Sequence, residues 1–402
     1  MDKTFRTLDD YDIDGKRVLV RADLNVPLEE GIVRDTTRIE RIAPTLEELS
    51  SKGAIVVVLS HLGRPRGAVV PNMSLAPLVG PLSVAIDRPV RFVATTWTNG
   101  EAQRAVSNAK PGDILLMENT RFHPGEEKNQ PKFVKMLTDL GDIFVNDAFS
   151  AAHRGHASTE GIAWFLPNAA GRAMEAEITA LEKTLIEPER PLTAIIGGAK
   201  ISTKIDVVGH LSSLVDCLVI GGGMANTFLE VQGHNIGKSI AEHDMAEKVD
   251  AILKEAEENN CEIVLPVDVV VAEDFKPHAP YRTVGLGEVG NREMILDIGP
   301  DTVSKIGETI DRSRTLVWNG PMGVFELPPF DAGTMAIADI AAKHCRDGKL
   351  LAVGGGGDTV AALNRNNLAK DFTYVSTAGG AFLEWLEGKV LPGVEVLQKS
   401  GA

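Results

Sequence analysis

Four consecutive glycines followed by an acid and a threonine are the residues of this sequence best suited to bind phosphate. The segment KLLAVGGGGDTVAALN, residues 349–364, is typical of a short buried strand, a turn at Gly354–Gly357 and a helix that opens at Thr359. Free N–H groups and the positive end of a helix dipole bind phosphate oxygens at such a junction, and the carboxylate of Asp358 would hold a hard cation beside them. Alternatively, the glycines only permit close packing and Asp358 is the helix N-cap.

Two further strand ends are rich in glycine. Leu192–Ile196 runs into Gly197-Gly198-Ala199-Lys200, and Cys217–Ile220 runs into Gly221-Gly222-Gly223. Three glycine-rich strand ends in one sheet favour phosphate binding over packing alone. Lys200 and Lys204 are four residues apart at the start of the next predicted helix, so we expect them to share a face near nucleotide phosphates. A plain pair of surface lysines is the alternative.

A further strand end, VWNGPMGVFE at Val317–Glu326, carries an amide and a carboxylate. Asn319 can offer its amide to the nucleotide, and Glu326 can offer its carboxylate to a ribose. The alternative for Glu326 is a turn carboxylate near Pro328, and the sequence leaves both interpretations open.

In the N-terminal half, four strand ends deliver cationic and polar residues. They read RADLNVP, SHLGRP, MENTRFHPG and NDAFSAAHRGH, and a further arginine follows in the first turn of the next helix. Guanidinium groups bind phosphate and carboxylate bidentately, so this set predicts a site for a small polyanion. Four solvated surface arginines are the alternative. The residues are Asp23, Asn25, Arg38, His61, Arg64, Arg121, His153, Arg154 and His156.

The elements that must position these residues are those of an α/β protein. Apolar runs at Val18–Val20, Ile55–Leu59, Val90–Val93, Ile114–Met117 and Ile143–Val145 alternate with helical patterns such as Thr37–Ser51. This alternation predicts a parallel sheet covered on both faces, whose ligands bind at the carboxyl ends of the strands. A second strand–helix series follows, with strands at Ile263–Leu265, Leu316–Val317 and Leu350–Val353 besides those that end in the glycines above.

The length of the chain and the distribution of its charge also indicate two domains, as the two strand–helix series do. A chain of 402 residues is long for one core, and its net charge of −15 is concentrated in residues 171–402, which carry −13. We expect an N-terminal domain at 1–170, an interdomain amphipathic helix at 171–186 and a C-terminal domain at 187–385. The acidic balance argues against partners that are nucleic acid or anionic membrane. Three scattered cysteines, a polar N-terminal segment and the lack of a long apolar run predict a cytoplasmic protein.

Two motif matches do not support the sites that such motifs usually indicate. Gly285–Gly290 matches G-x-G-x-x-G, but no helix pattern follows it as the dinucleotide fingerprint requires. His153 and His156 have metal-ligand spacing without further ligands at matching positions, so contact with an anion is the better interpretation. No P-loop sequence and no G-x-S-x-G elbow occurs.

Together the halves predict phosphoryl transfer between a small anion and a metal-bound nucleotide, in lobes that close together to exclude water. No catalytic base stands out. None is needed if the acceptor is a carboxylate, which is already ionised at neutral pH.

The motifs VLVRADLNVP, SHLGRP, ENTRFHPGEEKN, AHRGHAS, GGAK, VWNGPMGVFE and GGGGDT, in this order, resemble those of phosphoglycerate kinases. The resemblance runs from about Arg17 to the final helix. It implies reversible transfer between 1,3-bisphosphoglycerate with ADP and 3-phosphoglycerate with ATP, with Mg²⁺, in a monomer. It also implies two Rossmann-like lobes, with residues 386–402 returning to pack on the first.

The resemblance implies a role for each matching residue. Phosphoglycerate would be held by Asp23, Leu24, Asn25, Arg38, His61, Leu62, Gly63, Arg64, Arg121 and Arg154. Arg38 and Lys200 would stabilise the phosphoryl group in transfer. Asp358 would bind Mg²⁺ and Glu326 the ribose. Nucleotide phosphates would be contacted by Lys204, Asn319 and Thr359. The adenine side would be lined by Gly197, Gly198, Gly221 and Gly222, and the remaining nucleotide contacts would be Gly355, Gly356 and Gly357.

The sequence departs from the family pattern at Ile295, which would alter the edge of the adenine pocket, and at Ala378, which would alter the hinge geometry. A third departure, Gly155 in place of the usual alanine, is expected to have no effect. Two other functions compete with a kinase. A nicotinamide-dependent dehydrogenase would rest on the G-x-G-x-x-G match, and a non-catalytic nucleotide-binding module would bind nucleotide without phosphoglycerate.

Overall fold

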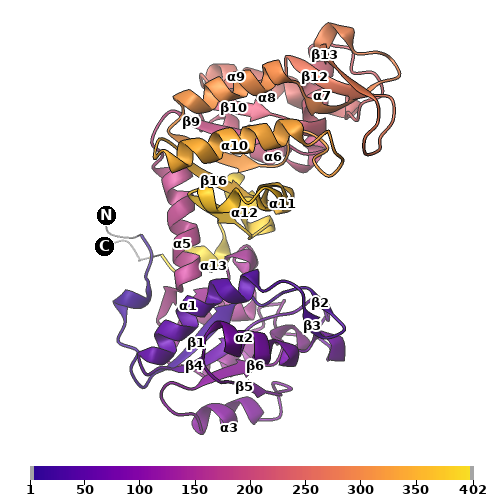
Figure 1. The fold of residues 1–402 in the computed structure, drawn as a ribbon. Helices are drawn as coiled ribbons and strands as arrows, with labels where there is room; N and C mark the ends of the chain where they lie inside the picture. Colours follow the sequence, from indigo (N-terminus) through magenta and orange to yellow (C-terminus); the bar gives the residue numbers. More distant parts are fainter. Residues whose placement is uncertain (1–3, 399–402) are drawn as a thin grey trace. The chain divides into compact units, whose positions relative to one another are not determined.

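The computed structural model describes residues 4–398, which divide into two compact units (Figure 1). The first unit comprises the chain up to Ile178 together with the segment from Val390 onward, and the second comprises Thr179–Lys389. Each unit contains one six-stranded parallel sheet. The prediction of an α/β protein with two parallel sheets flanked by helices is therefore confirmed.

The first sheet has the strand order β5-β6-β4-β1-β7-β8. The chain places β4 on one side of β1 and β7 on the other, so the strand order reverses between β1 and β7. Ligands of doubly wound sheets bind outside the carboxyl ends of the strands at this point. The strands are β1 (Arg17–Ala22), β4 (Ile55–Leu59), β5 (Val90–Val93), β6 (Ile114–Met117), β7 (Ile143–Asp147) and β8 (Asn168–Ala170).

Both faces of this sheet are covered, as its continuous apolar runs predict. Val18 and Val20 of β1 belong to a core with Ile42 and Leu46 of α1, the predicted helix Thr37–Ser51. Successive side chains of a strand alternate between faces, so Leu19 points to the other side. The other elements of the unit are α2 (Val79–Ala85), α3 (Glu101–Ser107), α4 (Pro131–Thr138), the ribbon β2 (Leu28–Glu29) with β3 (Ile32–Val33), and the short turns η1 (Leu8–Asp10), η2 (Pro71–Met73), η3 (Ala76–Leu78), η4 (Thr120–Phe122), η5 (Phe149–Ala151) and η6 (Ala157–Gly161).

The C-terminal segment adds to the first unit. Helix α13 (Pro392–Glu395) is held there by two hydrogen bonds at Gly393: its N–H donates to the carbonyl of Ala152 (2.8 Å), and its carbonyl accepts from Asn146 Nδ2 (3.0 Å). Gln398 forms a β-bridge with Phe5. Residues 399–402 of the predicted returning segment lie outside the described residues.

The second sheet has the order β11-β10-β9-β15-β16-β17, in which the third, second and first strands of the series precede the fourth, fifth and sixth. This is the order of the dinucleotide-binding doubly wound fold, and its switch point lies between β9 and β15. The first sheet departs from this order because β6 lies between β5 and β4. The strands are β9 (Leu192–Ile196), β10 (Cys217–Ile220), β11 (Glu262–Val264), β15 (Thr315–Asn319), β16 (Leu351–Gly355) and β17 (Tyr374–Ser376).

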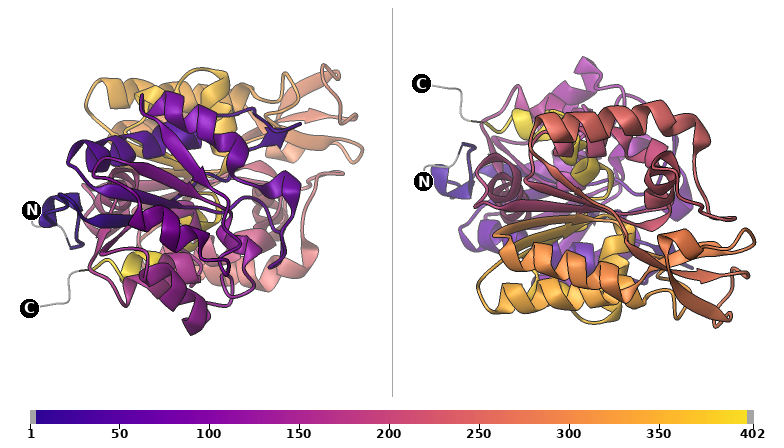
Figure 2. Two further views of the ribbon diagram at one scale, coloured as in Figure 1. Left: turned by 90° about the horizontal axis from the view of Figure 1, so that it is seen from below. Right: turned by 90° about the horizontal axis from the view of Figure 1, so that it is seen from above.

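Helices cover both faces of the second sheet. Figure 2 shows the sheet between α8 on one side and α9 and α10 on the other, and α8 packs with α6 and α7. The helices are α6 (Ile205–Ser212), α7 (Gly222–Val231), α8 (Ala246–Glu258), α9 (Pro300–Arg312), α10 (Ala332–Arg346), α11 (Gly357–Arg365) and α12 (Gly380–Leu386), with the turns η8 (Ile201–Thr203), η9 (His243–Met245) and η11 (Ala369–Asp371).

A three-stranded antiparallel sheet in this unit was not predicted. Its order is β13-β12-β14, from β12 (Asp268–Ala272), β13 (Tyr281–Gly285) and β14 (Met294–Ile298). The G-x-G-x-x-G match falls within it: Gly285 ends β13, and Leu286–Glu288 is a single 3₁₀ turn, η10. No helix follows, so the rejection of the dinucleotide fingerprint is confirmed.

The predicted helix at 171–186 is helical but not α-helical throughout. Helix α5 (Arg172–Leu181) continues as the π-helical turn η7 (Glu182–Ile186). The wider turn changes which side chains face inward, so Thr184 is buried and the predicted apolar residue Leu185 is only half-buried. Thr184 donates its hydroxyl to backbone carbonyls of the preceding turn, which periodicity alone does not reveal.

Candidate functional site

The glycine-rich junction at 354–357 serves both packing and turning. Gly354 and Gly355 belong to β16, contrary to the predicted turn, and a Cβ on Gly355 would lie 2.5 Å from the ring of Phe382. The chain turns at Gly356, whose φ of +93° favours glycine. Helix α11 begins at Gly357 rather than Thr359, so Asp358 lies exposed in its first turn and is not the N-cap.

Asn319 and Thr359 brace this junction. The amide of Asn319 donates to the carbonyl of Gly355 (2.9 Å), and the hydroxyl oxygen of Thr359 accepts from the N–H of Gly320 (2.6 Å). Both side chains are buried, and Asn319 Oδ1 has no hydrogen-bond partner. The loops after β15 and β16 are thereby held together, and one buried acceptor stays unused.

The two lysines do not share a helix face, so that prediction is wrong. Lys200 is extended and precedes the turn η8, and Lys204 lies at the junction of η8 and α6 with φ −135°. Lys200 is exposed, whereas Lys204 Nζ donates to the carbonyl oxygens of Gly197 (2.6 Å) and Asn319 (3.2 Å). Burial lowers the pKa of Lys204 to about 8, although Asp358 acts to raise it. Lys204 therefore places a cation at the switch point of the second sheet.

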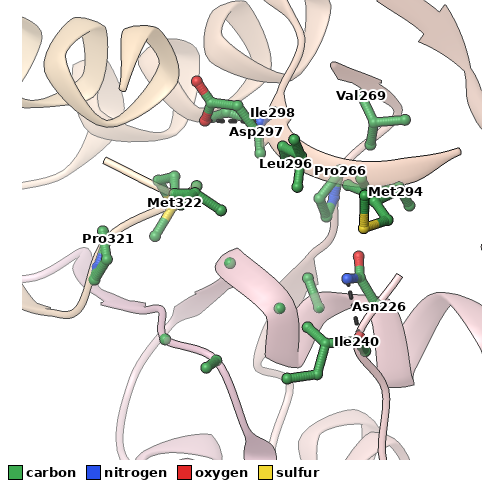
Figure 3. Close-up of a pocket in the computed structure, with 18 of the residues that line it drawn as sticks. Asn226, Ile240, Pro266, Val269, Met294, Leu296, Asp297, Ile298, Pro321 and Met322 are labelled. Atoms are coloured by element: carbon green, nitrogen blue, oxygen red, sulfur yellow. Dashed lines mark hydrogen bonds between the residues drawn. The ribbon is translucent and has the colours of Figure 1, made fainter. Parts of the chain in front are cut away.

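An apolar pocket of about 450 Å³ lies in the second unit beside these loops (Figure 3). Met294 and Leu296 of β14 line one side, and Asn226 and Ile240 lie opposite, with the amide of Asn226 donating to the carbonyl of Ile240 (3.1 Å). The wall also includes Gly198, Ala199, Gly222, Gly223, Lys238, Pro266, Val269, Phe275, Ile295, Asp297, Pro321, Met322, Val324, Glu326 and Asp358.

The pocket contains some of the predicted residues and not others. Gly198, Gly222, Glu326 and Asp358 line it, while Gly197 and Gly221 are buried and outside the lining set. Its antiparallel wall was missed because β12 and β14 lie outside the alternating strand–helix series from which the site residues were taken. The one signal was Ile295, a departure from the family pattern, and it does line the pocket. Apolar walls with few polar groups are typical of small-ligand sites.

We expect Gly197→Ala to disrupt this site. A Cβ on Gly197 would lie 1.9 Å from the carbonyl oxygen of Pro321, a fixed backbone atom of the pocket wall. The variant should lose nucleotide binding in calorimetry and unfold at a lower temperature. Gly209→Ala is the matched control, because a Cβ there meets nothing within 4 Å inside α6. It should bind nucleotide normally and be stabilised by about 0.5–1 kcal/mol. Equal behaviour of the two variants would contradict the steric argument.

In the first unit, the loops after β1 and β7 meet at Asp23. Arg38 Nη1 lies 2.8–2.9 Å from both carboxylate oxygens of Asp23, and Ser150 donates its hydroxyl to the same group (2.5 Å). Asn25 Oδ1 accepts from the N–H of Gly63 (2.9 Å), which ties the loop after β4 to the loop after β1. These three predicted strand ends are therefore in contact near the switch point, and the fourth joins them through the hydrogen bond from Arg121 to Gly63.

Arg121 forms a cationic cluster with Arg21 and Arg154 nearby, beside the buried and neutral His61 and His156. Arg121 is 3% exposed and donates to the carbonyl of Gly63 (2.8 Å), but its Nε makes no hydrogen bond and lies 3.4 Å from Glu127. Burial, together with Arg21 and Arg154, lowers the pKa of Arg121 to about 10. Burial and Arg121 lower the pKa of His156 to about 3. Such a cluster is suited to an anion.

Sequence reasoning missed Arg21. It lies within β1, 1% exposed, 2.7 Å from His61 Nδ1. It opens the segment RADLNVP but was not selected as a site residue, and β1 extends to Ala22, two residues beyond the predicted run Val18–Val20, which buries it. Of the predicted residues, Arg154 contacts His153, Leu24 and Leu62 are buried, and Arg64 is exposed.

The described residues contain no group of three or more His, Cys, Asp or Glu side chains placed to hold a metal. A Mg²⁺ ion bound to a nucleotide does not need one, because phosphate oxygens and water supply most of its ligands. The exposed carboxylate of Asp358, at a helix N-terminus on the pocket wall, fits that coordination.

The fold and the two sites define a two-unit α/β protein with a nucleotide-type pocket in one unit and a small-anion site in the other. Residues 8–389 match the family model described as "Phosphoglycerate kinase". Phosphoglycerate kinases of Sinorhizobium medicae and Chelativorans sp. are 58% and 57% identical over 98% of this chain and 99% of their own length. The Coxiella burnetii phosphoglycerate kinase structure is 40% identical with a TM-score of 0.91, and that from Pyrococcus horikoshii is 30% identical with a TM-score of 0.79. Each covers 98% of both chains.

This chain belongs to the phosphoglycerate kinase family. It transfers a phosphoryl group reversibly between 1,3-bisphosphoglycerate with ADP and 3-phosphoglycerate with ATP, in glycolysis and gluconeogenesis. The family works on a magnesium-bound nucleotide. The alternatives of a dehydrogenase and of a non-catalytic nucleotide-binding module are therefore wrong. Among residues 4–398, no helix is long and apolar enough to cross a membrane.

Proposed function

We propose that the first unit binds phosphoglycerate through its cationic cluster. The observation that carries this assignment is Arg121, buried among Arg21 and Arg154 with its Nε unbonded. A phosphate or carboxylate would supply the missing acceptor and offset the crowded positive charge. Asp23, Leu24, Asn25, Arg38, His61, Leu62, Gly63 and Arg64 complete the proposed site.

The second unit binds the nucleotide in this proposal. The apolar pocket takes the base, and the loops that contain Gly197, Gly198, Gly221 and Gly222 line its adenine side. Glu326 on the pocket wall binds the ribose, and the loop that contains Gly355–Gly357 lies against the phosphates. Lys204, Asn319 and Thr359 hold these loops together, and Asn319 Oδ1 is left as an acceptor. Asp358 would bind Mg²⁺, which neutralises phosphate charge when it is bound.

The transfer itself needs positioning and charge neutralisation more than proton transfer. The acceptor carboxylate of 3-phosphoglycerate is ionised at neutral pH, so no general base is required. Arg38 and Lys200 neutralise the equatorial oxygens of the phosphoryl group. Arg38 is preorganised for this role by its two contacts with Asp23.

Calorimetry on two variants tests which unit binds phosphoglycerate and which binds the nucleotide. Arg121→Ala should lose binding of 3-phosphoglycerate and keep MgADP binding, because it removes the buried cation from the first unit alone. Glu326→Ala should weaken MgADP by about tenfold, the loss of a hydrogen bond to a charged group, and keep phosphoglycerate binding. If either variant lost the other ligand instead, the assignment would be reversed.

We also propose that the protein is a cytoplasmic monomer. Light scattering on the purified protein tests the oligomeric state.

A further inference from the structure

A buried polar chain runs from Glu126 to His61 behind the proposed anion site. Glu126 is 0% exposed, and its two carboxyl oxygens accept from the hydroxyl (2.5 Å) and the N–H (3.1 Å) of Ser158. Thr120 donates a third, longer hydrogen bond to it (3.3 Å). All these contacts use Glu126 as an acceptor, which is the pattern of an ionised carboxylate. Burial raises the pKa of Glu126, while Arg21 and the hydrogen bonds from Ser158 act to lower it.

Ser158 is also hydrogen-bonded to Arg21. The hydroxyl oxygen of Ser158 accepts from Arg21 Nε (2.9 Å) while its proton is donated to Glu126. Arg21 also donates Nη1 to the carbonyl of Ala22 (2.5 Å) and Nη2 to the ring of His61 (2.7 Å). Each nitrogen of this guanidinium thus has a partner inside the protein, and the side chain is only 1% exposed. Arg21 is therefore placed to orient neighbours rather than to contact a ligand.

The contact between Arg21 and His61 fixes the protonation of the imidazole. A guanidinium only donates, so His61 Nδ1 must be the unprotonated, accepting nitrogen. The ring proton then lies on Nε2, and the ring is neutral. Burial and the charged groups that face the ring, Arg21, Arg121, His156 and Arg154, also lower the pKa of His61 well below its usual value.

We propose that Glu126, Ser158 and Arg21 form a positioning relay that holds His61 in the neutral Nε2–H tautomer, so that Nε2 donates a hydrogen bond to the bound phosphoglycerate. The relay rests on the proposed binding of phosphoglycerate by His61. It assigns roles to Glu126 and Ser158, both of which are 0% exposed. It also makes His61 a directional donor rather than a cation.

The relay and simple electrostatics predict opposite effects for Glu126→Gln. If Glu126 acts only by its charge, removing a negative charge near an anion site should tighten phosphoglycerate binding. If Glu126 orients Arg21, the variant should raise KM for 3-phosphoglycerate. Ser158→Ala breaks the same chain without changing any charge, and it should raise KM in the same way.

Nitrogen NMR of histidine-labelled full-length protein tests the tautomer directly, with the His61 signals assigned by their loss in His61→Gln. We expect an unprotonated Nδ1 and a protonated Nε2 from pH 5 to pH 8. A protonated Nδ1, or titration near the ordinary pKa of histidine, would overturn the proposal. This measurement needs no variant of the relay to fold.

Kinetics of the two relay variants complete the test, with folding checked by circular dichroism. KM for 3-phosphoglycerate should rise about tenfold to a hundredfold, the range for a hydrogen bond to a charged group, while KM for ATP stays unchanged. The matched control is Asp142→Asn, which breaks the half-exposed pair with Arg17 elsewhere in the unit and should leave both KM values unchanged. An unchanged or lowered KM for 3-phosphoglycerate in both relay variants would refute the relay. Failure of the wild-type protein to bind phosphoglycerate would instead refute the proposed function, because the NMR result stands apart from it.

Discussion

Asp358→Ala is expected to lower kcat by on the order of 10²- to 10³-fold, the usual effect of removing one group that stabilises transition-state charge. Asp358 is the acidic side chain on the pocket wall beside the glycine-rich junction, exposed in the first turn of α11. Without it, Mg²⁺ would lose its proposed protein ligand and the nucleotide phosphates would be less well oriented. Steady-state kinetics with saturating MgATP and 3-phosphoglycerate measure the effect.

The helix α9 offers a matched control for Asp358. Asp301 is also an exposed aspartate at the second position of a helix in the same unit, and it is not part of the pocket lining. Asp301→Ala should leave kcat unchanged. Calorimetry should show that Asp358→Ala still binds 3-phosphoglycerate and that its ADP affinity no longer depends on Mg²⁺. A normal kcat in Asp358→Ala would refute the proposed metal role.

Arg38→Ala is expected to lower kcat by about 10³-fold or more, as for arginines that stabilise a transferring phosphoryl group. Asp23 keeps its hydrogen bond from Ser150 in this variant, so the loops after β1 and β7 stay joined. Phosphoglycerate should therefore still bind, and the loss should fall on kcat rather than on KM. Single-turnover kinetics separate the chemical step from binding.

The control for Arg38 lies four residues earlier. Arg34 forms an exposed ion pair with Glu29 (2.8 Å) on the ribbon β2–β3. Arg34→Ala removes a cation of the same kind from the same region, and it should leave kcat and KM unchanged. An increase in KM alone for Arg38→Ala would mean that Arg38 contributes to ground-state binding only.

Local sequence patterns were sufficient for most of the parallel framework. Ile55–Leu59, Ile114–Met117, Leu192–Ile196 and Cys217–Ile220 have the bounds that their apolar runs predict, and so does the helix Thr37–Ser51. These elements are buried on both faces or carry a clear apolar stripe, so their signal is local and strong. The antiparallel sheet β12-β13-β14 was missed although β12 contains the apolar run Val269–Ala272, because its strands do not alternate with helices and β13 is mostly exposed.

For the candidate site residues, the sequence likewise determined one property and left another open. The sequence by itself determined which residue types stand at the strand ends: the arginines and histidines of the first unit and the glycines, lysines and acid of the second. Their spacing did not determine geometry. Lys200 and Lys204 are four apart, yet a 3₁₀ turn separates them: Lys200 is exposed, whereas Lys204 is half-buried and hydrogen-bonded at the switch point.

The tertiary structure alone decided which atoms are left to bind a ligand. In the folded protein, Arg21 is hydrogen-bonded to buried groups, whereas Arg121 Nε and Asn319 Oδ1 have no hydrogen bond. Strand β14 forms one wall of the pocket. The physical reason is that hydrogen bonding and burial depend on neighbours distant in the chain. A sequence shows which groups can donate or accept, and only the packed fold shows which of them already have.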